Sequence, residues 1–537
     1  MTEKSCPLFS SYLKGLQGPI RCPLCYQYVD GNVRRHITDV HGEEELRRAV
    51  LADKESGIPD AEIGRRYGIS FSKLEQFITE AYGANVSVLK RPKPIRRWAP
   101  KNFREETTSV WSFKQRGDWA THDGRYRGNW SPYIPRNIIL KYSQPGDIVL
   151  DYFVGGGTTA IEAKLLGRRC IARDINPSAV DMTRENLRFS PPHQLLSGGA
   201  LSLYEPEVSI GDARYLSDIN NNSIDLICAH PPYAGIIKYS ARVEGDLSGL
   251  SVQDFLIEMR KVARESLRVL KPGGKCAILI GDTRQSKHIV PLGFQTLRVF
   301  LEAGFILREL IIKRQHNCKT TGFWYIRSIQ RNFLLLAHEY LPIFEKPSAE
   351  RGVERHTLGE FTLPYRVVAE KARRPETESL ETTTVWIFPK ERLEQEVQRN
   401  LLRRFADPDG HVAQVKWEEG HGVAHLDRPL NLVYVPWPRH DGMTQPRFMG
   451  YRNAVRRIVE QSRYALCPGG FLVLEAVDFR HEGVFWPAGL ILYEDLRSYP
   501  DFSLNEIIIV VFQESPRESP GPDLEIVHRY LLVYSIK

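Results

Sequence analysis

One short stretch constrains the fold of this chain more than any other: an apolar run that ends in an acid and leads directly into three glycines. Residues 147–151 (Asp-Ile-Val-Leu-Asp) are typical of a buried parallel strand. The glycines at 155–157 let the backbone turn sharply and approach a ligand, because no side chain stands in the way. Residues 158–166 then begin a helix whose free amides face the same ligand. The stretch therefore predicts a ligand site in an α/β fold.

A second predicted strand supplies another acid at the same edge. Residues 170–174 end in Asp174, and a carboxylate there can accept both hydroxyls of a ribose, as in dinucleotide-binding folds. The dinucleotide fingerprint G-x-G-x-x-G requires a third glycine, which residues 155–159 lack. A purely structural glycine turn is the remaining alternative, and Asp174 in register argues against it.

A third predicted strand, residues 223–228, leads into His230-Pro231-Pro232-Tyr233. If the ligand beside this segment is a base with an exocyclic amine, that amine is a poor nucleophile because its lone pair is delocalised into the ring. The His230 side chain and the Pro231 carbonyl would accept its two hydrogens and favour a more tetrahedral nitrogen. The two prolines fix this geometry in advance, and Tyr233 can stack on a base flipped out of the helix. The structural alternative is a Pro-Pro turn with a packed tyrosine.

Together the two motifs resemble the S-adenosylmethionine-dependent DNA amino-methyltransferases, which methylate the exocyclic nitrogen of adenine or cytosine. Residues 151–159 (Asp-x-Phe-x-Gly-x-Gly-Thr-Thr) match the first motif of that family, and residues 174–177 match its second. The resemblance covers roughly residues 106–346. The family usually has Ser, Asp or Asn where this chain has His230. A neutral histidine accepts a hydrogen bond only in the right tautomer, so we expect a pH optimum above the histidine pKa.

The resemblance implies a cofactor site and an amine site. It assigns S-adenosylmethionine to Ser131, Pro135, Asp151, Phe153, Gly155, Gly157, Thr158, Asp174 and Asp212, and catalysis to His230, Pro231, Pro232 and Tyr233. Residues 129–138 are expected to close over the methionine end of the cofactor, and Asp212 to accept its adenine amino group. Residues 333–341 are expected to form the final edge hairpin of the sheet.

The expected reaction is in-line methyl transfer to a flipped base in double-stranded DNA, with cytosine N4 slightly ahead of adenine N6. A similar tetrapeptide occurs in some RNA methyltransferases, so an RNA base methyltransferase is the first alternative. A DNA-binding regulator on an inactive methyltransferase fold is the second. The intact acids and glycines of the cofactor motif argue against inactivity.

The amino terminus carries four metal-ligand residues at close spacing: Cys22, Cys25, His36 and His41. A β-hairpin and one helical face present such a quartet to a tetrahedral structural Zn²⁺. The central gap of ten residues is shorter than in the commonest C2H2 finger, so the turn must be tighter. The finger either reads DNA or is structural or protein-binding.

Two further segments follow the finger. Residues 56–78 resemble a helix-turn-helix, with a turn at Gly68 and a second helix that would enter a major groove; helical packing without DNA contact is the alternative. Between Ala81 and Arg104 there are seven basic residues and no acid, among them Lys90, Arg91, Lys93, Arg96 and Arg97. Prolines make this segment extended, either as a solvated tether or as a strap that follows phosphates.

The carboxyl-terminal third repeats parts of the methyltransferase segment. Pro272, Asp282 and Arg284 recur 196 positions later without a gap, and residues 527–531 echo 337–341. Residues 381–388 similarly echo 106–113. These echoes occur in the same order in both segments and predict an internal duplication; the alternative is that they reflect only the strand and turn patterns that α/β proteins share. The copy has no glycine-rich turn before residue 430, and Pro436-Trp-Pro438 stands where His-Pro-Pro-Tyr would be. It is therefore expected to bind no cofactor and to brace the catalytic half or hold DNA.

We thus predict an α/β protein: a Rossmann-like methyltransferase sheet, a second degenerate methyltransferase-like domain, and a small N-terminal zinc finger with a helical module. The expected domains are a zinc finger (1–46), a helix-turn-helix-like module (47–85), a basic linker (86–105), a catalytic domain (106–348) and a degenerate domain without a cofactor motif (376–537). A net charge of +8 suits a polyanionic partner. Eight cysteines in no paired pattern, no signal peptide and no long apolar run favour the cytoplasm. A restriction or defence-system partner would fit this class, although the sequence names none.

Overall fold

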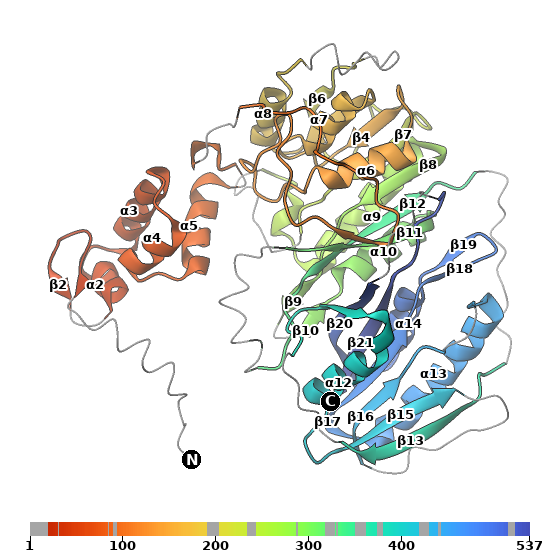
Figure 1. Ribbon diagram of the computed structural model, residues 1–537. Helices are drawn as coiled ribbons and strands as arrows, with labels where there is room; N and C mark the ends of the chain where they lie inside the picture. Colours follow the sequence, from red (N-terminus) through yellow and green to blue (C-terminus); the bar gives the residue numbers. More distant parts are fainter. Residues whose placement is uncertain are drawn as a thin grey trace. The chain divides into compact units, whose positions relative to one another are not determined.

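The computed structural model describes most of the chain (Figure 1). The described residues are 20–29, 32–83, 85–89, 94–190, 203–233, 243–285, 288–316, 328, 331–348, 361–372, 380–417, 429–438, 442–513 and 521–537. They fall into two compact units. The N-terminal unit comprises the described parts of 1–94, 123–128 and 237–244, and the sheet unit comprises those of 95–122, 129–236 and 245–537. Among the described residues, no helix is both long and apolar enough to cross a membrane.

The N-terminal unit is a short hairpin followed by a small helical bundle. Its elements are β1 (Ile20–Arg21), β2 (Tyr28–Val29), α2 (Val33–Val40), α3 (Glu43–Glu55), α4 (Asp60–Tyr67), α5 (Phe71–Tyr82) and the 3₁₀ helix η1 (Ser87–Leu89). Helix α4 ends at Gly68, which adopts the left-handed conformation, and Ser70 caps α5 by accepting a hydrogen bond from the Lys73 amide. The predicted helix–turn–helix succession is therefore present.

The core of this unit contains buried apolar residues from each of the helices α2, α3, α4 and α5. Ile37, Leu46, Ile63 and Leu74 are fully buried against one another. A later stretch of the chain, residues 123–128, also belongs to the unit: the Val86 amide donates to the Arg125 carbonyl at 2.9 Å. This return of the chain to the N-terminal unit was not predicted.

The first half of the sheet unit is an eight-stranded sheet in the order β3-β11-β12-β8-β7-β4-β5-β6. The strands are β3 (Val110–Ser112), β4 (Ile148–Asp151), β5 (Arg169–Asp174), β6 (Glu207–Ile210), β7 (Ile224–Ala229), β8 (Leu270–Ile278), β11 (Ile306–Arg314) and β12 (His338–Glu345). The run β8-β7-β4-β5-β6 is parallel, whereas β12 pairs antiparallel with both β8 and β11. Buried apolar runs in β4, β7 and β8 fit strands that are covered on both faces.

Helices cover both faces of this sheet. They are α6 (Tyr133–Tyr142), α7 (Thr158–Leu165), α8 (Pro177–Asn186), η3 (Leu247–Gly249), α9 (Val252–Val269) and α10 (Leu292–Glu302), and a small hairpin of β9 (Thr283–Gln285) and β10 (His288–Val290) precedes α10. Apolar residues of α9 and α10 pack into one core cluster and those of α6 and α7 into another. The arrangement is the predicted Rossmann-like α/β sheet.

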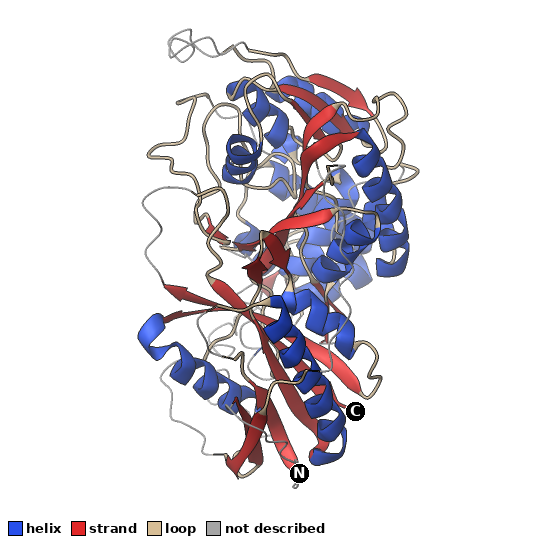
Figure 2. Ribbon diagram, turned by 90° about the vertical axis from the view of Figure 1, so that its right-hand side faces the viewer, coloured by secondary structure: helices blue, strands red, loops and turns tan. Residues whose placement is uncertain are grey.

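A second sheet of seven strands forms the rest of the unit, in the order β13-β15-β16-β17-β21-β20-β14. The strands are β13 (Tyr365–Lys371), β14 (Val385–Pro389), β15 (His411–Trp417), β16 (Leu430–Val435), β17 (Leu466–Ala476), β20 (Phe502–Gln513) and β21 (His528–Ile536). The accompanying elements are η4 (Lys390–Arg392), α12 (Leu393–Phe405), α13 (Gln445–Ala465), α14 (Ala488–Leu496) and the hairpin of β18 (Phe479–His481) and β19 (Val484–Trp486). Helices lie along both sides of the strands (Figure 2).

The second sheet repeats the first strand by strand from its β14 edge. The β14-β20-β21-β17-β16-β15 succession has the same relative strand directions as β3-β11-β12-β8-β7-β4. The registers also correspond, since Ile343 pairs with Ala277 and Val533 pairs with Val473. Beyond β15 the likeness ends, because an antiparallel strand, β13, stands in the place of β5.

The two halves contact each other through matching polar pairs. Arg284 on β9 donates to Glu506 on β20 at 2.6 Å, and its counterpart Arg480 on β18 donates to Glu309 on β11. Two buried histidines behave in the same way. His338 Nδ1 lies 2.8 Å from Thr384 Oγ1 of the second half, and His528 Nδ1 lies 2.8 Å from Ser109 Oγ of the first half. Each half therefore supplies a hydroxyl that forms a hydrogen bond with the buried histidine of the other half.

Three expectations about chain layout differ from the structure. Strand β12 is internal, not an edge, because it pairs with β11 on one side and β8 on the other, and the edge strand is β3. The second sheet begins at Tyr365, before the expected boundary at 376, because β13 pairs with β15. In the linker, Lys90, Arg91 and Lys93 lie outside the described residues, whereas Trp98 packs on Phe189 of the sheet unit with ring centroids 5.6 Å apart. An apolar side chain in a basic segment thus fixes its second part to a core.

Candidate active site and zinc site

Both predicted motifs lie at the carboxyl ends of neighbouring strands. Strands β4 and β7 are parallel and adjacent, with Val149 opposite Leu226 and Leu150 opposite Ile227. The glycine turn follows β4 and the His230–Tyr233 segment follows β7. In open α/β sheets this edge is where ligands bind.

The glycine turn requires glycine at specific positions. Gly155 and Gly157 have φ values of 54° and 87°, which side chains rarely adopt. A Cβ at Gly157 would also lie 3.0 Å from Thr183 Cγ2 of helix α8. The turn leads directly into α7, whose first residue, Thr158, is buried.

Two acids support this turn, Asp151, which is buried, and Asp174, which is partly buried. Asp174 accepts hydrogen bonds from the Gly155 and Asn176 amides, both at 2.9 Å, and burial raises its pKa to about 6 although those amides lower it. Asp151 accepts from the Phe153 amide at 2.9 Å, and burial raises its pKa to about 7. A carboxylate oxygen has two lone pairs, so Asp174 can accept ribose hydroxyls while it holds the turn. The glycine turn and the acids therefore fit a nucleoside-bearing cofactor such as S-adenosylmethionine.

Asp212 lies just beyond the end of β6 and is bound to its own loop. Its carboxylate accepts from the Arg214 amide at 2.9 Å and from the Arg214 guanidinium at 2.6 Å. Arg214 also pairs with Glu258 on α9. If Asp212 accepts the cofactor's adenine amino group, as predicted, it does so with an oxygen that it shares with Arg214.

The segment before α6 contacts the glycine turn through a residue that was not singled out. Asn129 Oδ1 accepts a hydrogen bond from the Gly156 amide at 3.1 Å. Of the two predicted residues, Ser131 donates to the Arg116 carbonyl at 2.7 Å and Pro135 is buried in α6. The position of this segment beside the turn suits the predicted role of closing over the cofactor.

The amine motif is held by aromatic contacts. The Trp130 and His230 rings stack with centroids 5.6 Å apart and an angle of 21°. The Tyr233 ring meets His230 edge-on, and its hydroxyl lies 3.0 Å from His230 Nε2. Pro231 is buried and Pro232 is partly exposed. Because Tyr233 Oη also donates to Glu339 at 2.6 Å, the hydroxyl of this tyrosine is directed into the protein.

Glu339 and Lys313 at this site were not predicted from the sequence. Glu339, 6% exposed on β12, accepts from Lys313 Nζ at 2.7 Å, and the two residues are opposite each other in the β11–β12 ladder. The internal repeat could have drawn attention to Glu339. Both copies have a His-x-Tyr sequence at this strand, and the middle residue is Glu339 in the first copy and Arg529 in the second.

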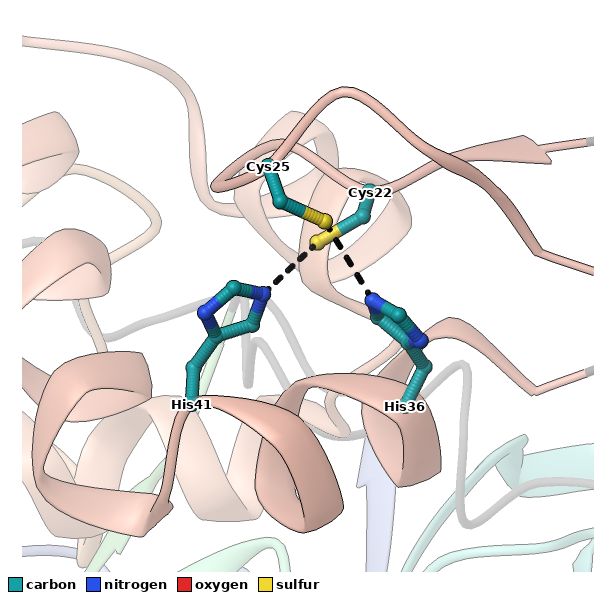
Figure 3. Close-up of side chains that lie close together, drawn as sticks. All are labelled: Cys22, Cys25, His36 and His41. Carbon is teal, nitrogen blue, oxygen red and sulfur yellow. Dashed lines mark hydrogen bonds between the residues drawn. The ribbon is translucent and has the colours of Figure 1, made fainter.

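The N-terminal unit brings the predicted metal ligands together (Figure 3). Cys22 and Cys25 lie on the turn between β1 and β2, His36 on α2, and His41 at the end of that helix. All four ligand atoms lie within 4.8 Å of one another. Cys22 Sγ is 3.7 Å from His41 Nε2, and Cys25 Sγ is 3.4 Å from His36 Nε2.

These separations suit a tetrahedral ion. Zn–S and Zn–N bonds of about 2.3 and 2.0–2.1 Å place sulfur and nitrogen ligands about 3.6 Å apart at tetrahedral angles. The two observed sulfur–nitrogen distances lie on either side of that value. These two sulfur–nitrogen separations are therefore compatible with a tetrahedral Zn²⁺.

Comparison with known proteins agrees with the sheet-edge geometry. The family described as DNA methylase (N6_N4_Mtase) matches residues 69–185 and 224–415, which is more than half of the chain. A tRNA (guanine(10)-N2)-dimethyltransferase of Methanothermobacter thermautotrophicus is 35% identical over 132 residues, 24% of this chain and 34% of that protein. The type II methyltransferase M2.DpnII of Streptococcus pneumoniae is 35% identical over 89 residues, 16% of this chain and 32% of that protein. The chain thus spans about a third of the length of these relatives.

Among solved structures, a SAM-dependent methyltransferase of Methanosarcina mazei is 18% identical, with a TM-score of 0.27 over 39% of this chain and 97% of that one. That score is too low to support an argument by itself. The family match covers both the glycine turn and the strands of the amine site. The chain therefore belongs to the DNA methylase family, the S-adenosylmethionine-dependent amino-methyltransferases.

Proposed function

We propose that this protein methylates an exocyclic amine, cytosine N4 or adenine N6, of a base flipped out of DNA. The observation that carries the proposal is the adjacency of β4 and β7, whose carboxyl ends hold the glycine turn and the His230–Tyr233 segment. A cofactor at the first strand end and a base at the second would meet at one edge of the sheet.

The residues of this edge divide into two tasks. Gly155, Gly157 and the first turn of α7 would hold the cofactor, and Asp174 its ribose. When bound, S-adenosylmethionine supplies an electrophilic methyl group: the nitrogen–carbon bond forms as the carbon–sulfur bond breaks, and the amine loses a proton. His230 would accept one amine hydrogen and the Pro231 carbonyl the other, which localises the nitrogen lone pair. Catalysis is then mainly positioning, with no covalent enzyme intermediate.

RNA is the second candidate substrate because one similar protein is named as a tRNA guanine-N2 methyltransferase. Guanine N2 is also an exocyclic amine, so the same site chemistry would serve.

The test is incubation of the full-length protein with isotopically labelled S-adenosylmethionine and either DNA or RNA, followed by mass spectrometry of the nucleosides. Labelled N4-methylcytosine or N6-methyladenine from DNA is the expected result and identifies the base. Label found in RNA alone would transfer the proposal to the alternative substrate. No label in either, with no cofactor binding by calorimetry, would contradict the enzyme assignment.

We also propose that Cys22, Cys25, His36 and His41 bind a structural Zn²⁺ in the N-terminal unit. The metal would join the β1–β2 turn to α2, in a unit that depends on a small core. The purified protein should contain one zinc per chain by elemental analysis. Cys25→Ser should remove it and lower DNA affinity, whereas the control Cys467→Ser in the second half should do neither. Full zinc occupancy in Cys25→Ser would contradict the site.

Finally, we propose that the chain is organised as a zinc finger, a helical module, a basic linker, a catalytic half and a degenerate second half that braces it. The reciprocal contacts Arg284–Glu506 and Arg480–Glu309 support this role for the second half. In that half Gln414 stands, by ladder register, where Asp151 stands in the catalytic half.

A further inference from the structure

A hydrogen-bonded chain of three residues ends on the histidine of the amine site. His230 Nε2 lies 3.0 Å from Tyr233 Oη, and Tyr233 Oη lies 2.6 Å from Glu339 Oε1. The other oxygen of Glu339 accepts from Lys313 Nζ at 2.7 Å. The direction of each bond in this chain follows from the chemistry of its ends.

Glu339 is an ionised carboxylate and can only accept hydrogen bonds. Burial acts to raise its pKa, but the Lys313 ammonium, the positive charge of His230 when that ring is protonated, and the hydrogen bonds from Lys313 and Tyr233 outweigh burial and lower the pKa to about 2. Tyr233 has a single hydroxyl proton, and that proton is donated to Glu339. The bond between Tyr233 Oη and His230 Nε2 must then be donated by the histidine. A neutral His230 therefore carries its proton on Nε2 and its lone pair on Nδ1.

The groups around this chain fix its geometry. Trp130 stacks on the His230 ring and limits its rotation. Gly281 allows the tyrosine and the glutamate to meet, because a Cβ there would lie 3.0 Å from the Tyr233 ring and 3.3 Å from Glu339 Cγ.

The second half of the sheet unit provides an internal control. By ladder register, His230 corresponds to Pro436, Glu339 to Arg529 and Lys313 to Val510. The flanking residues are retained, since His338 and Tyr340 correspond to His528 and Tyr530. The Lys–Glu pair is thus absent where the histidine is absent, so the fold does not require it.

We propose that Glu339, acting through Tyr233, is a positioning residue that sets the tautomer of His230 and so presents Nδ1 as the acceptor for the target amine. This assignment rests on the proposed function for its meaning in catalysis. It explains how a histidine can replace the Ser, Asp or Asn usual at this position, since those residues always offer an acceptor oxygen and histidine does so from only one nitrogen at a time.

The decisive experiment is ¹⁵N NMR of the full-length protein labelled at histidine, at a pH where the ring is neutral. The His230 signals are identified by their loss in His230→Asn. The expected result is a protonated Nε2 and an unprotonated Nδ1. Tyr233→Phe should shift His230 to a mixture of tautomers. A proton on Nδ1 in the wild type, or an unchanged spectrum in Tyr233→Phe, would overturn the proposal.

A matched control exists in the second half, where Tyr434 Oη donates to Glu475 Oε2, also at 2.6 Å. Tyr434→Phe removes an equivalent tyrosine–glutamate bond and should leave the His230 signals unchanged. In transfer assays at saturating substrates, Tyr233→Phe should lower the rate roughly tenfold and Tyr434→Phe should not. A Tyr233→Phe rate equal to wild type would reject the positioning role.

The two proposals fail separately. If the wild type transfers no methyl group to DNA or RNA but shows the expected nitrogen signals, the proposed function is wrong and the tautomer assignment stands. If transfer is observed but Nδ1 carries the proton, the enzyme assignment stands and the positioning role of Glu339 is wrong.

Discussion

The two halves of the sheet unit share their framework and differ at the strand ends. Both have the same succession of six strands and the same reciprocal arginine–glutamate contacts. At the end of β7 the catalytic half has His230, whereas the second half has Pro436 followed by Trp437, which packs on Tyr451 with centroids 4.9 Å apart. An aromatic cluster thus fills the edge that carries the amine motif in the other half. The arginine and glutamate residues that join the halves occur in both halves, whereas the histidine proposed to accept the amine occurs in one.

The largest effect should come from the residue that differs most between the two edges. His230→Ala should lower methyl transfer on the order of a hundredfold to a thousandfold, because a preorganised acceptor for the amine is lost. Its counterpart Pro436→Ala should leave the rate unchanged. Cofactor affinity, measured by calorimetry, should stay near wild type in both. Equal rates for the two variants would mean that the amine site lies elsewhere.

The shared framework is tested by removing one acid at each reciprocal contact. Glu309→Ala and Glu506→Ala should each lower the free energy of unfolding by roughly 3 kcal/mol, because Arg480 or Arg284 then loses its buried partner. Urea denaturation measures both variants. Similar losses would support an equivalent role at both contacts. A loss in only one variant would show that the resemblance between the halves is confined to the backbone.

The pH dependence of stability should show the same duplication. Burial raises the pKa of Asp282 and of its counterpart Asp478 to about 7. A carboxyl group with a raised pKa in the folded state stabilises the protein fully below its unfolded pKa, and that stability is lost as the pH rises through about 7. Between pH 5 and 8, deprotonation of each of these two carboxyl groups should lower the free energy of unfolding by roughly 2 kcal/mol.

Asp282→Asn and Asp478→Asn should each flatten part of this pH dependence, as measured by urea denaturation at several pH values. The double variant should flatten it most. The same pH dependence in the double variant as in the wild type would contradict the raised pKa values.

The smallest effect should come from the exchanged hydroxyls. Ser109→Ala and Thr384→Val each leave a buried histidine nitrogen, of His528 or His338, without its partner across the halves. Each should destabilise the protein by about 1–2 kcal/mol. Thermal melts measure the two variants side by side. No loss in either would mean that these hydrogen bonds do not hold the halves together.

Much of the fold could be predicted because the decisive signals are local. The apolar run before the glycine turn specifies a strand, and the turn specifies the start of a helix. Gly68 and Ser70 likewise mark the ends of the predicted helices in the N-terminal unit. The quartet of metal ligands was predictable because all four residues lie within twenty positions of one another.

What could not be predicted depends on partners that are distant in sequence. Strand β12 is internal because it inserts between β11 and β8, and the edge is formed by the short strand β3, far earlier in the chain. Strand β13 has no counterpart in the repeat, so no echo extended the second half back to Tyr365. Glu339 gains its role from Tyr233, 106 positions away. Such pairings become visible only when the strands are in place.

The exchange of hydroxyls also has a consequence for the order in which the protein is made. Ser109 lies next to the catalytic sheet and contacts His528, 419 positions later in the chain. The Ser109 amide also donates to the Glu525 carbonyl at 2.8 Å. During translation the cofactor and amine motifs emerge long before those residues, so the edge of the catalytic sheet cannot be completed early. A chain interrupted in its second half would carry every residue proposed for catalysis and still lack part of the support for their sheet. Assembly of the first half is thereby tied to completion of the second.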